Sequence, residues 1–93
     1  MNVAQTILSQ IKAIDGRALW AWGAKELVNT GKGLQFRTGG MAKHKGLVHI
    51  KLNANDLYDI EFYKIRAGII KTVATEADVF AEDLVRMIDA VVQ

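Results

Sequence analysis

The chain has 93 residues, of which 51% are hydrophobic and 24% are charged, a composition typical of a folded protein rather than a disordered or collagen-like one. The absence of cysteine excludes disulfides and thiolate chemistry. No apolar run approaches the ~20 residues needed to cross a bilayer, and no basic-then-apolar leader is visible. We therefore expect a single domain over residues 1–93 with a cytoplasmic location and no membrane partner.

Charge is distributed unevenly along the chain. Residues 1–51 hold eight Lys or Arg and two acids, whereas residues 52–93 hold four and eight, and the net charge is +2. No acid occurs between Glu26 and Asp56. Such a local basic segment favours binding to phosphates or to an acidic protein.

The N-terminal segment has the apolar spacing of an amphipathic helix. Asn2 is a favoured N-cap, and Gln5 stands where a capping-box partner would stand. We expect a helix over residues 3–14, with its apolar stripe formed by Val3, Ile7, Leu8, Ile11 and Ile14.

From residue 17 the pattern changes to the alternation typical of strands. Residues 18–23 predict a strand with Trp20 and Trp22 on one face, and residues 24–29 either continue it or form a helical turn. Further strands are expected at 34–37, 47–52, 57–66 and 69–74, the last two joined by a tight turn at Ala67-Gly68.

The C-terminal segment predicts a helix that begins after Thr75, with Phe80, Leu84 and Ile88 on its apolar face. The order is therefore α-β-β-β-β-β-α. We expect an α+β fold in which an antiparallel sheet of four or five strands is flanked by an N-terminal and a C-terminal helix packed on one face.

The alternation also predicts the register between residues 47–52 and 57–66. We consider the register in which the residue numbers of the two paired residues add up to 110. The pairs Leu52–Tyr58, Ile50–Ile60 and Val48–Phe62 then fall on the side of the sheet that the helices cover. Lys51–Asp59, His49–Glu61 and Leu47–Tyr63 then fall on the opposite side, and the charged pairs are complementary when His49 is protonated. A shift by one position would mix the two faces.

Candidate chemistry is sparse. Ser9 is the only serine and has no nucleophile-elbow glycines around it, and two histidines without cysteine make a poor metal site. We expect no cofactor, no metal and no catalytic residue. Asp59 and Glu61 could form an acid/base pair on one strand face, but a surface pairing with basic residues fits the register better.

The aromatic residues allow two interpretations. Trp20 and Trp22 on one strand, with Tyr58, Phe62 and Tyr63 on another, could stack nucleic-acid bases beside the basic segment. The alternative is that one of them fills the core together with Phe36, Tyr58 and Phe62, leaving Tyr63 on the uncovered face.

Partner contacts are expected from the basic segment and the uncovered face. The segment 39–46 should be an exposed, mobile loop, because glycines bracket its basic residues. The predicted partner-binding residues are Lys32, Arg37, Lys43, His44, Lys45, His49, Lys51 and Tyr63.

Four segments carry a resemblance to a known group. The stretches Asn2–Leu8 (NVAQTIL), Trp22–Lys25 (WGAK), Asp56–Phe62 (DLYDIEF) and Val79–Leu84 (VFAEDL) together resemble a family of small uncharacterised proteins of bacteriophages and related mobile elements. The resemblance covers most of the chain, and its motifs are structural. It implies expression inside a bacterium and a role in host takeover, counter-defence or phage DNA metabolism.

Three functions fit these observations. The first is a non-enzymatic accessory protein that binds a host or defence protein, for example as an inhibitor. The second is nucleic-acid binding through the basic segment 32–51. The third is a small enzyme or an enzyme subunit, and self-association remains open in each case.

Overall fold

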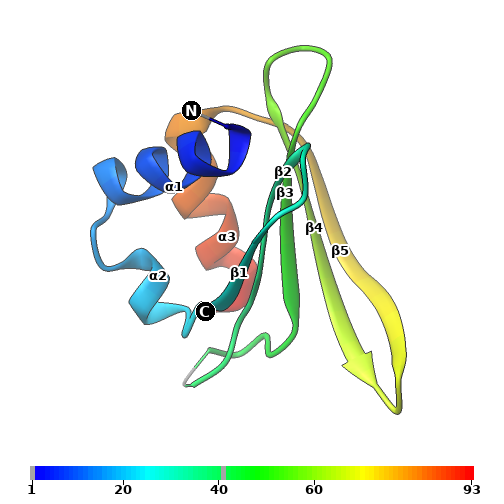
Figure 1. Ribbon diagram of the computed structural model, residues 1–93. Coiled ribbons are helices and arrows are strands. Elements are labelled where there is room, and N and C mark those ends of the chain that lie inside the picture. The colour runs from blue at the N-terminus through cyan, green and yellow to red at the C-terminus, as the bar shows by residue number, and fades with distance from the viewer. Residues whose placement is uncertain (1, 41) are drawn as a thin grey trace.

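The computed structural model describes residues 2–40 and 42–93, which form a five-stranded antiparallel sheet with helices on one side of it (Figure 1). The expected α+β class is confirmed. The sheet order follows the chain: β1 (Lys25–Asn29), β2 (Gly33–Arg37), β3 (Leu47–Leu52), β4 (Tyr58–Arg66) and β5 (Ile69–Val79). The helices are α1 (Val3–Ile14), α2 (Ala18–Ala21), the 3-10 turn η1 (Ala81–Asp83) and α3 (Leu84–Val92).

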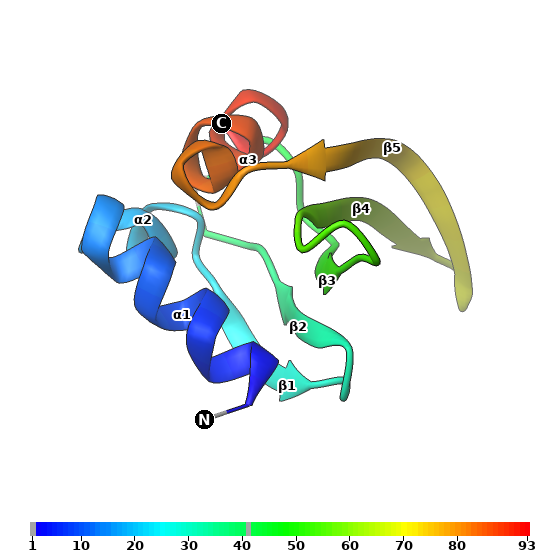
Figure 2. The same cartoon turned by 90° about the horizontal axis from the view of Figure 1, so that it is seen from above.

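Helix α1 forms where the apolar stripe predicts it. The Asn2 side chain accepts a hydrogen bond from the Gln5 backbone N–H at 2.8 Å, and the Gln5 side chain accepts one from the Asn2 backbone N–H at 3.4 Å. This capping box satisfies two donors at the start of the helix. Ile7 and Ile11 are fully buried against the sheet, together with Leu84 and Ile88 of α3. Figure 2 shows α1 and α3 covering the same side of the strands.

The predicted β3–β4 register is confirmed at all six pairs, from Leu52–Tyr58 to Leu47–Tyr63. Burial explains why it is unique: Val48, Ile50, Ile60 and Phe62 are fully buried, and a shift by one residue would turn this set to the open face. Leu52, at the end of its strand, is only partly covered.

The strand expected over residues 18–23 is wrong. These residues form α2 and a turn, closed by a hydrogen bond from the Trp22 N–H to the Ala18 carbonyl at 3.0 Å. Two residues apart on a helix point to nearly opposite sides, so Trp22 is fully buried whereas Trp20 is 85% exposed. Trp22 stacks on Phe36 with ring centroids 5.9 Å apart, and its indole N–H donates to Asp89. The core interpretation therefore holds for Trp22, and the strand begins at Lys25.

The start expected for the C-terminal helix is also wrong. Strand β5 continues to Val79, which pairs with Tyr58, and α3 begins only at Leu84. The backbone of the nine-residue strand β4 finds its hydrogen-bond partners along this longer β5. As a result Phe80 is 54% exposed instead of packing with Leu84.

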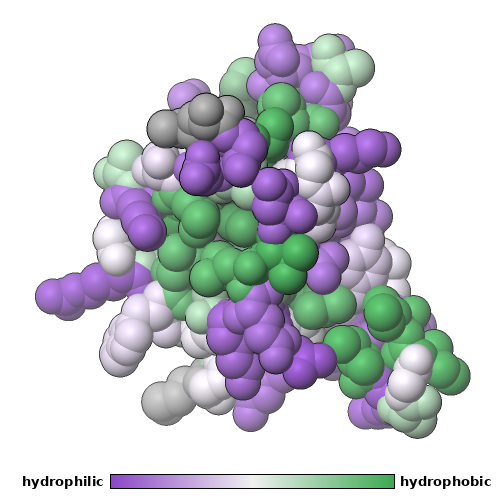
Figure 3. Space-filling model, in the orientation of Figure 1, coloured by the Kyte–Doolittle hydropathy of each residue, from purple (hydrophilic) through white to green (hydrophobic). Residues whose placement is uncertain are grey.

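The sheet is not covered evenly. The end of β4 and the beginning of β5 form a hairpin that extends past the helices at the lower right of Figure 1. Its residues Ile65, Ile69 and Ile70 are exposed, and green apolar atoms gather there among purple polar ones in Figure 3. No helix in the described part of the chain has the length and apolar character needed to cross a membrane.

Candidate functional site

Six cationic side chains line two depressions of about 410 and 230 Å³ at one end of the sheet. The depressions share Lys45 and Ile65, so they form one continuous surface. No acid of the described residues lines either depression. We call this the basic end surface, and its cations are Lys25, Arg37, Lys43, Lys45, Lys64 and Arg66.

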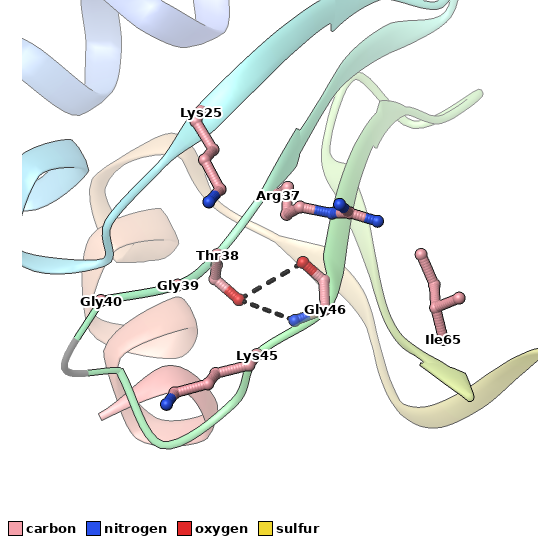
Figure 4. A pocket seen from close by; sticks show the side chains of 8 residues that line it. All are labelled: Lys25, Arg37, Thr38, Gly39, Gly40, Lys45, Gly46 and Ile65. Carbon is pink, nitrogen blue, oxygen red and sulfur yellow. Dashed lines mark hydrogen bonds between the residues drawn. The ribbon is translucent and has the colours of Figure 1, made fainter. Parts of the chain in front are cut away.

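The larger depression has a floor of closely packed backbone (Figure 4). The buried Thr38 hydroxyl accepts from the Gly46 N–H at 3.1 Å and donates to the His44 carbonyl at 2.5 Å. A Cβ at Gly46 would lie 2.0 Å from the Tyr63 carbonyl oxygen, so only glycine fits between β4 and the floor. Lys25, from β1, and Lys45, from the loop before β3, therefore flank a fixed surface.

The loop 39–46 is not the exposed segment that its glycines predict. Ala42 and His44 are 4% and 5% exposed, while Met41 lies outside the described residues. The backbone N–H groups of Lys43 and His44 both donate to the Val92 carbonyl, at 2.7 and 3.2 Å. The loop thus binds the last turn of α3, whose unpaired carbonyls need donors. Among the side chains of this loop that the structure describes, those of Lys43 and Lys45 are exposed.

Positive charge on the basic end surface is almost uncompensated. Arg37 Nε lies 3.7 Å from Glu26 Oε2, and both side chains are well exposed. This is the only ion pair that the described residues make with any of the six cations. An exposed pair of this kind contributes at most about 1 kcal/mol. The surface is therefore suited to a ligand with several negative charges.

The structure divides the predicted partner-binding residues among four places. Arg37, Lys43 and Lys45 belong to the basic end surface. Lys32 lies at the other end of β2, where its carbonyl accepts from the Leu52 N–H. His44 is a correction: it packs edge-on against Phe62 inside the molecule, with ring centroids 5.9 Å apart, and offers no surface to a partner.

The remaining three predicted residues, His49, Lys51 and Tyr63, lie on the open face around Glu61. A hydrogen bond from Lys51 lowers the pKa of the Glu61 carboxyl, and burial beside that carboxylate raises the pKa of Tyr63. Hydrogen bonds from Asn53 and from the Asp78 backbone lower the pKa of Asp59. Both carboxyls are thus held ionised beside a shallow depression of about 180 Å³, as expected for surface pairing.

Three cations of the surface lie outside the segment that the sequence singled out: Lys25, Lys64 and Arg66. A signal for two of them was present. Continuing the 110-sum register beyond Leu47–Tyr63 places Lys64 opposite Gly46 and Arg66 opposite His44. Lys25 of β1 reaches the basic end surface because it pairs with Arg37 of β2. No local sequence pattern encodes this pairing.

Comparison of the chain with family models, with curated proteins and with solved structures finds no match.

Proposed function

We propose that the protein is a non-enzymatic accessory protein that binds nucleic acid through the basic end surface. The observation that carries this proposal is the gathering of six cations, from four separate parts of the chain, around a floor without acids. The sequence alone favoured a host or defence protein as partner. Lys64 and Arg66 line the same depression as Lys43 and Lys45, and this concentration of positive charge favours a polyanionic ligand over a protein partner.

Phosphate groups fit this surface for a physical reason. Each cation that neutralises a phosphate releases a condensed counterion, which drives binding in dilute salt. The six side chains are long and mostly exposed, so they can follow a flexible phosphate backbone without a precise pocket. The slope of log K against log salt should be about −0.7 for each phosphate neutralised on a single strand and about −0.9 on a duplex.

The test is a titration of labelled single-stranded and duplex oligonucleotides, followed by fluorescence anisotropy at several salt concentrations. The variant Lys43→Glu/Lys45→Glu should bind both more weakly and with a shallower salt slope. Lys12→Glu/Lys32→Glu is the matched control, because it changes the net charge equally at exposed positions that line neither depression. Equal weakening by the two variants, or no binding by the wild type, would overturn the proposal.

A protein partner is the second candidate, and one observation favours it. Strand β1 is an edge of the sheet, and its residues Leu27 and Val28 are 47% and 48% exposed. An open edge with apolar side chains can accept a strand from another chain. A pulldown from bacterial lysate with and without nuclease separates the two functions: a partner that survives nuclease and is lost in Leu27→Lys supports this one.

The resemblance to bacteriophage and mobile-element proteins supports a proposal for the cellular setting. We propose that the protein acts in the cytoplasm of a bacterial host, in phage DNA metabolism if nucleic acid is its ligand and in counter-defence if a host protein is. Phage-infection assays with the charge variants test this setting.

A further inference from the structure

Trp20 is the most exposed of the large hydrophobic residues that the structure describes, at 85%. The core does not depend on it, because the neighbouring Trp22 is the residue that stacks on Phe36 and donates to Asp89. An indole left in water forgoes the stabilisation that burial would give. An aromatic side chain in this position has a face available for a ligand.

The backbone holds Trp20 in a defined place. Its carbonyl accepts from the Gly23 N–H at 3.0 Å, and the Ala24 N–H donates to the Leu19 carbonyl at 2.9 Å. The Gly39 N–H donates to the Trp22 carbonyl at 3.2 Å, which ties the end of α2 to the backbone below the basic end surface. The ring is therefore presented by an anchored turn.

Trp20 also adjoins the cations. It lines an apolar depression of about 520 Å³ together with Ala21, Gly23 and Ala24. Lys25 and Gly40 complete this depression and also line the basic one, so the two are continuous. In Figure 4 the Lys25 side chain extends from β1 above the Gly39–Gly40 backbone. Lys25 therefore belongs both to the depression beside the indole and to the basic end surface.

We propose that Trp20 is a stacking platform for an unpaired base, and that single-stranded nucleic acid is therefore the preferred ligand. This inference rests on the proposed function and specifies its substrate class. A positively charged track beside an exposed aromatic ring is the arrangement that suits single strands, because every base has a face that can stack. Bases of a duplex are stacked on one another and cannot reach the ring.

The first experiment compares Trp20→Ala with the wild type on an oligothymidylate and on a duplex of equal length. Loss of one stacked base should weaken single-strand binding roughly 5- to 150-fold and leave both duplex binding and the salt slope unchanged. Trp20→Phe should restore most of the affinity. Phe80→Ala removes another exposed aromatic, 54% accessible, at the other end of the sheet, and should leave single-strand binding unchanged.

The outcomes separate the two proposals. A wild type that binds neither oligonucleotide overturns both. A wild type that binds, with Trp20→Ala binding equally well or with duplex preferred, overturns only the stacking role. Weakening by Lys43→Glu/Lys45→Glu in that case leaves the proposed function intact.

Tryptophan fluorescence gives a second measurement on the unaltered chain. Trp20 and Trp22 are the only two tryptophans, and one is exposed while the other is buried. The oligothymidylate should quench the Trp20 emission of the wild type over the same concentration range as the anisotropy change. Trp20→Phe, which retains only Trp22, should bind without quenching. Equal quenching in that variant, or none in the wild type, would contradict stacking on Trp20.

Discussion

Lys51 Nζ lies 2.6 Å from Glu61 Oε1, so its ion pair runs diagonally across β3 and β4 rather than to Asp59, the residue directly opposite. The Asp59 carboxylate instead accepts from the Asn53 amide at 3.0 Å and from the Asp78 N–H at 3.1 Å. His49 Nδ1 is 3.9 Å from the same Glu61 oxygen. Burial and the Lys51 charge lower the pKa of His49 despite Glu61, so a neutral imidazole is favoured near neutral pH.

The first prediction concerns this histidine. Its folded pKa lies below the unfolded value of 6.5, so the stability it contributes is complete above pH 6.5 and is lost as pH falls through the folded pKa. His49→Gln should make the free energy of unfolding flatter between pH 7 and about pH 5. Asp59 and Glu61 have pKa values lowered from 3.8 and 4.5, so they titrate below this window. Urea denaturation at three pH values measures the effect, and an unchanged pH slope in the variant would contradict it.

The second prediction distinguishes two residues that the sequence placed on one helix face. Leu84 is fully buried, and Leu84→Ala should lower the free energy of unfolding by about 2–5 kcal/mol. Phe80→Ala removes a larger side chain, but one that is 54% exposed, and should cost less than Leu84→Ala. Chemical denaturation of both variants is the measurement. The reverse order of losses would mean that α3 packs through Phe80.

The third prediction concerns the floor of the basic end surface. Gly46→Ala would place a methyl group 2.0 Å from the Tyr63 carbonyl oxygen, so the β3–β4 pair must shift, at a cost of about 1–3 kcal/mol. Gly16→Ala is the matched control, because its nearest neighbour, the Lys12 carbonyl oxygen, would be 3.9 Å away. Thermal unfolding should show a large decrease for the first variant and almost none for the second. Comparable melting temperatures would show that the close approach is absent.

The parts of the fold that could be predicted are those where a local pattern and long-range packing agree. The α1 cap and stripe are encoded within 14 residues, and the β3–β4 register follows from alternation because one face is buried. The errors occur where the local pattern is ambiguous. Trp20 and Trp22 alternate as in a strand, yet the same spacing in a helical turn buries one ring and exposes the other.

In the candidate site too, the residues marked by a local pattern could be predicted, and those that depend on long-range packing could not. Three residues of the run without acids, Arg37, Lys43 and Lys45, lie on the basic end surface. The side chain of His44 was misplaced because the sequence does not reveal that its loop binds the end of α3. Lys25 joins the surface only through strand pairing, a long-range relationship that composition cannot supply.

The last prediction uses a like-charge pair beside that surface. Lys71 lies directly opposite Lys64 in the β4–β5 hairpin. Like charges that face each other across two strands destabilise the pairing. Lys71→Glu should therefore raise the melting temperature in low salt, and the gain should shrink in 1 M salt, where the screening length is about 3 Å.

The same substitution should weaken nucleic-acid binding and make its salt dependence shallower, because it places an acid beside Lys64. Lys71→Gln, which only removes the charge, should give a smaller change in both measurements. The melting temperature would then rise while the affinity for nucleic acid falls. This result is expected if the two lysines repel each other within the hairpin and both attract a polyanionic ligand. A fall in melting temperature would contradict the pairing of Lys64 with Lys71, and unchanged binding would place the boundary of the basic end surface at Lys64.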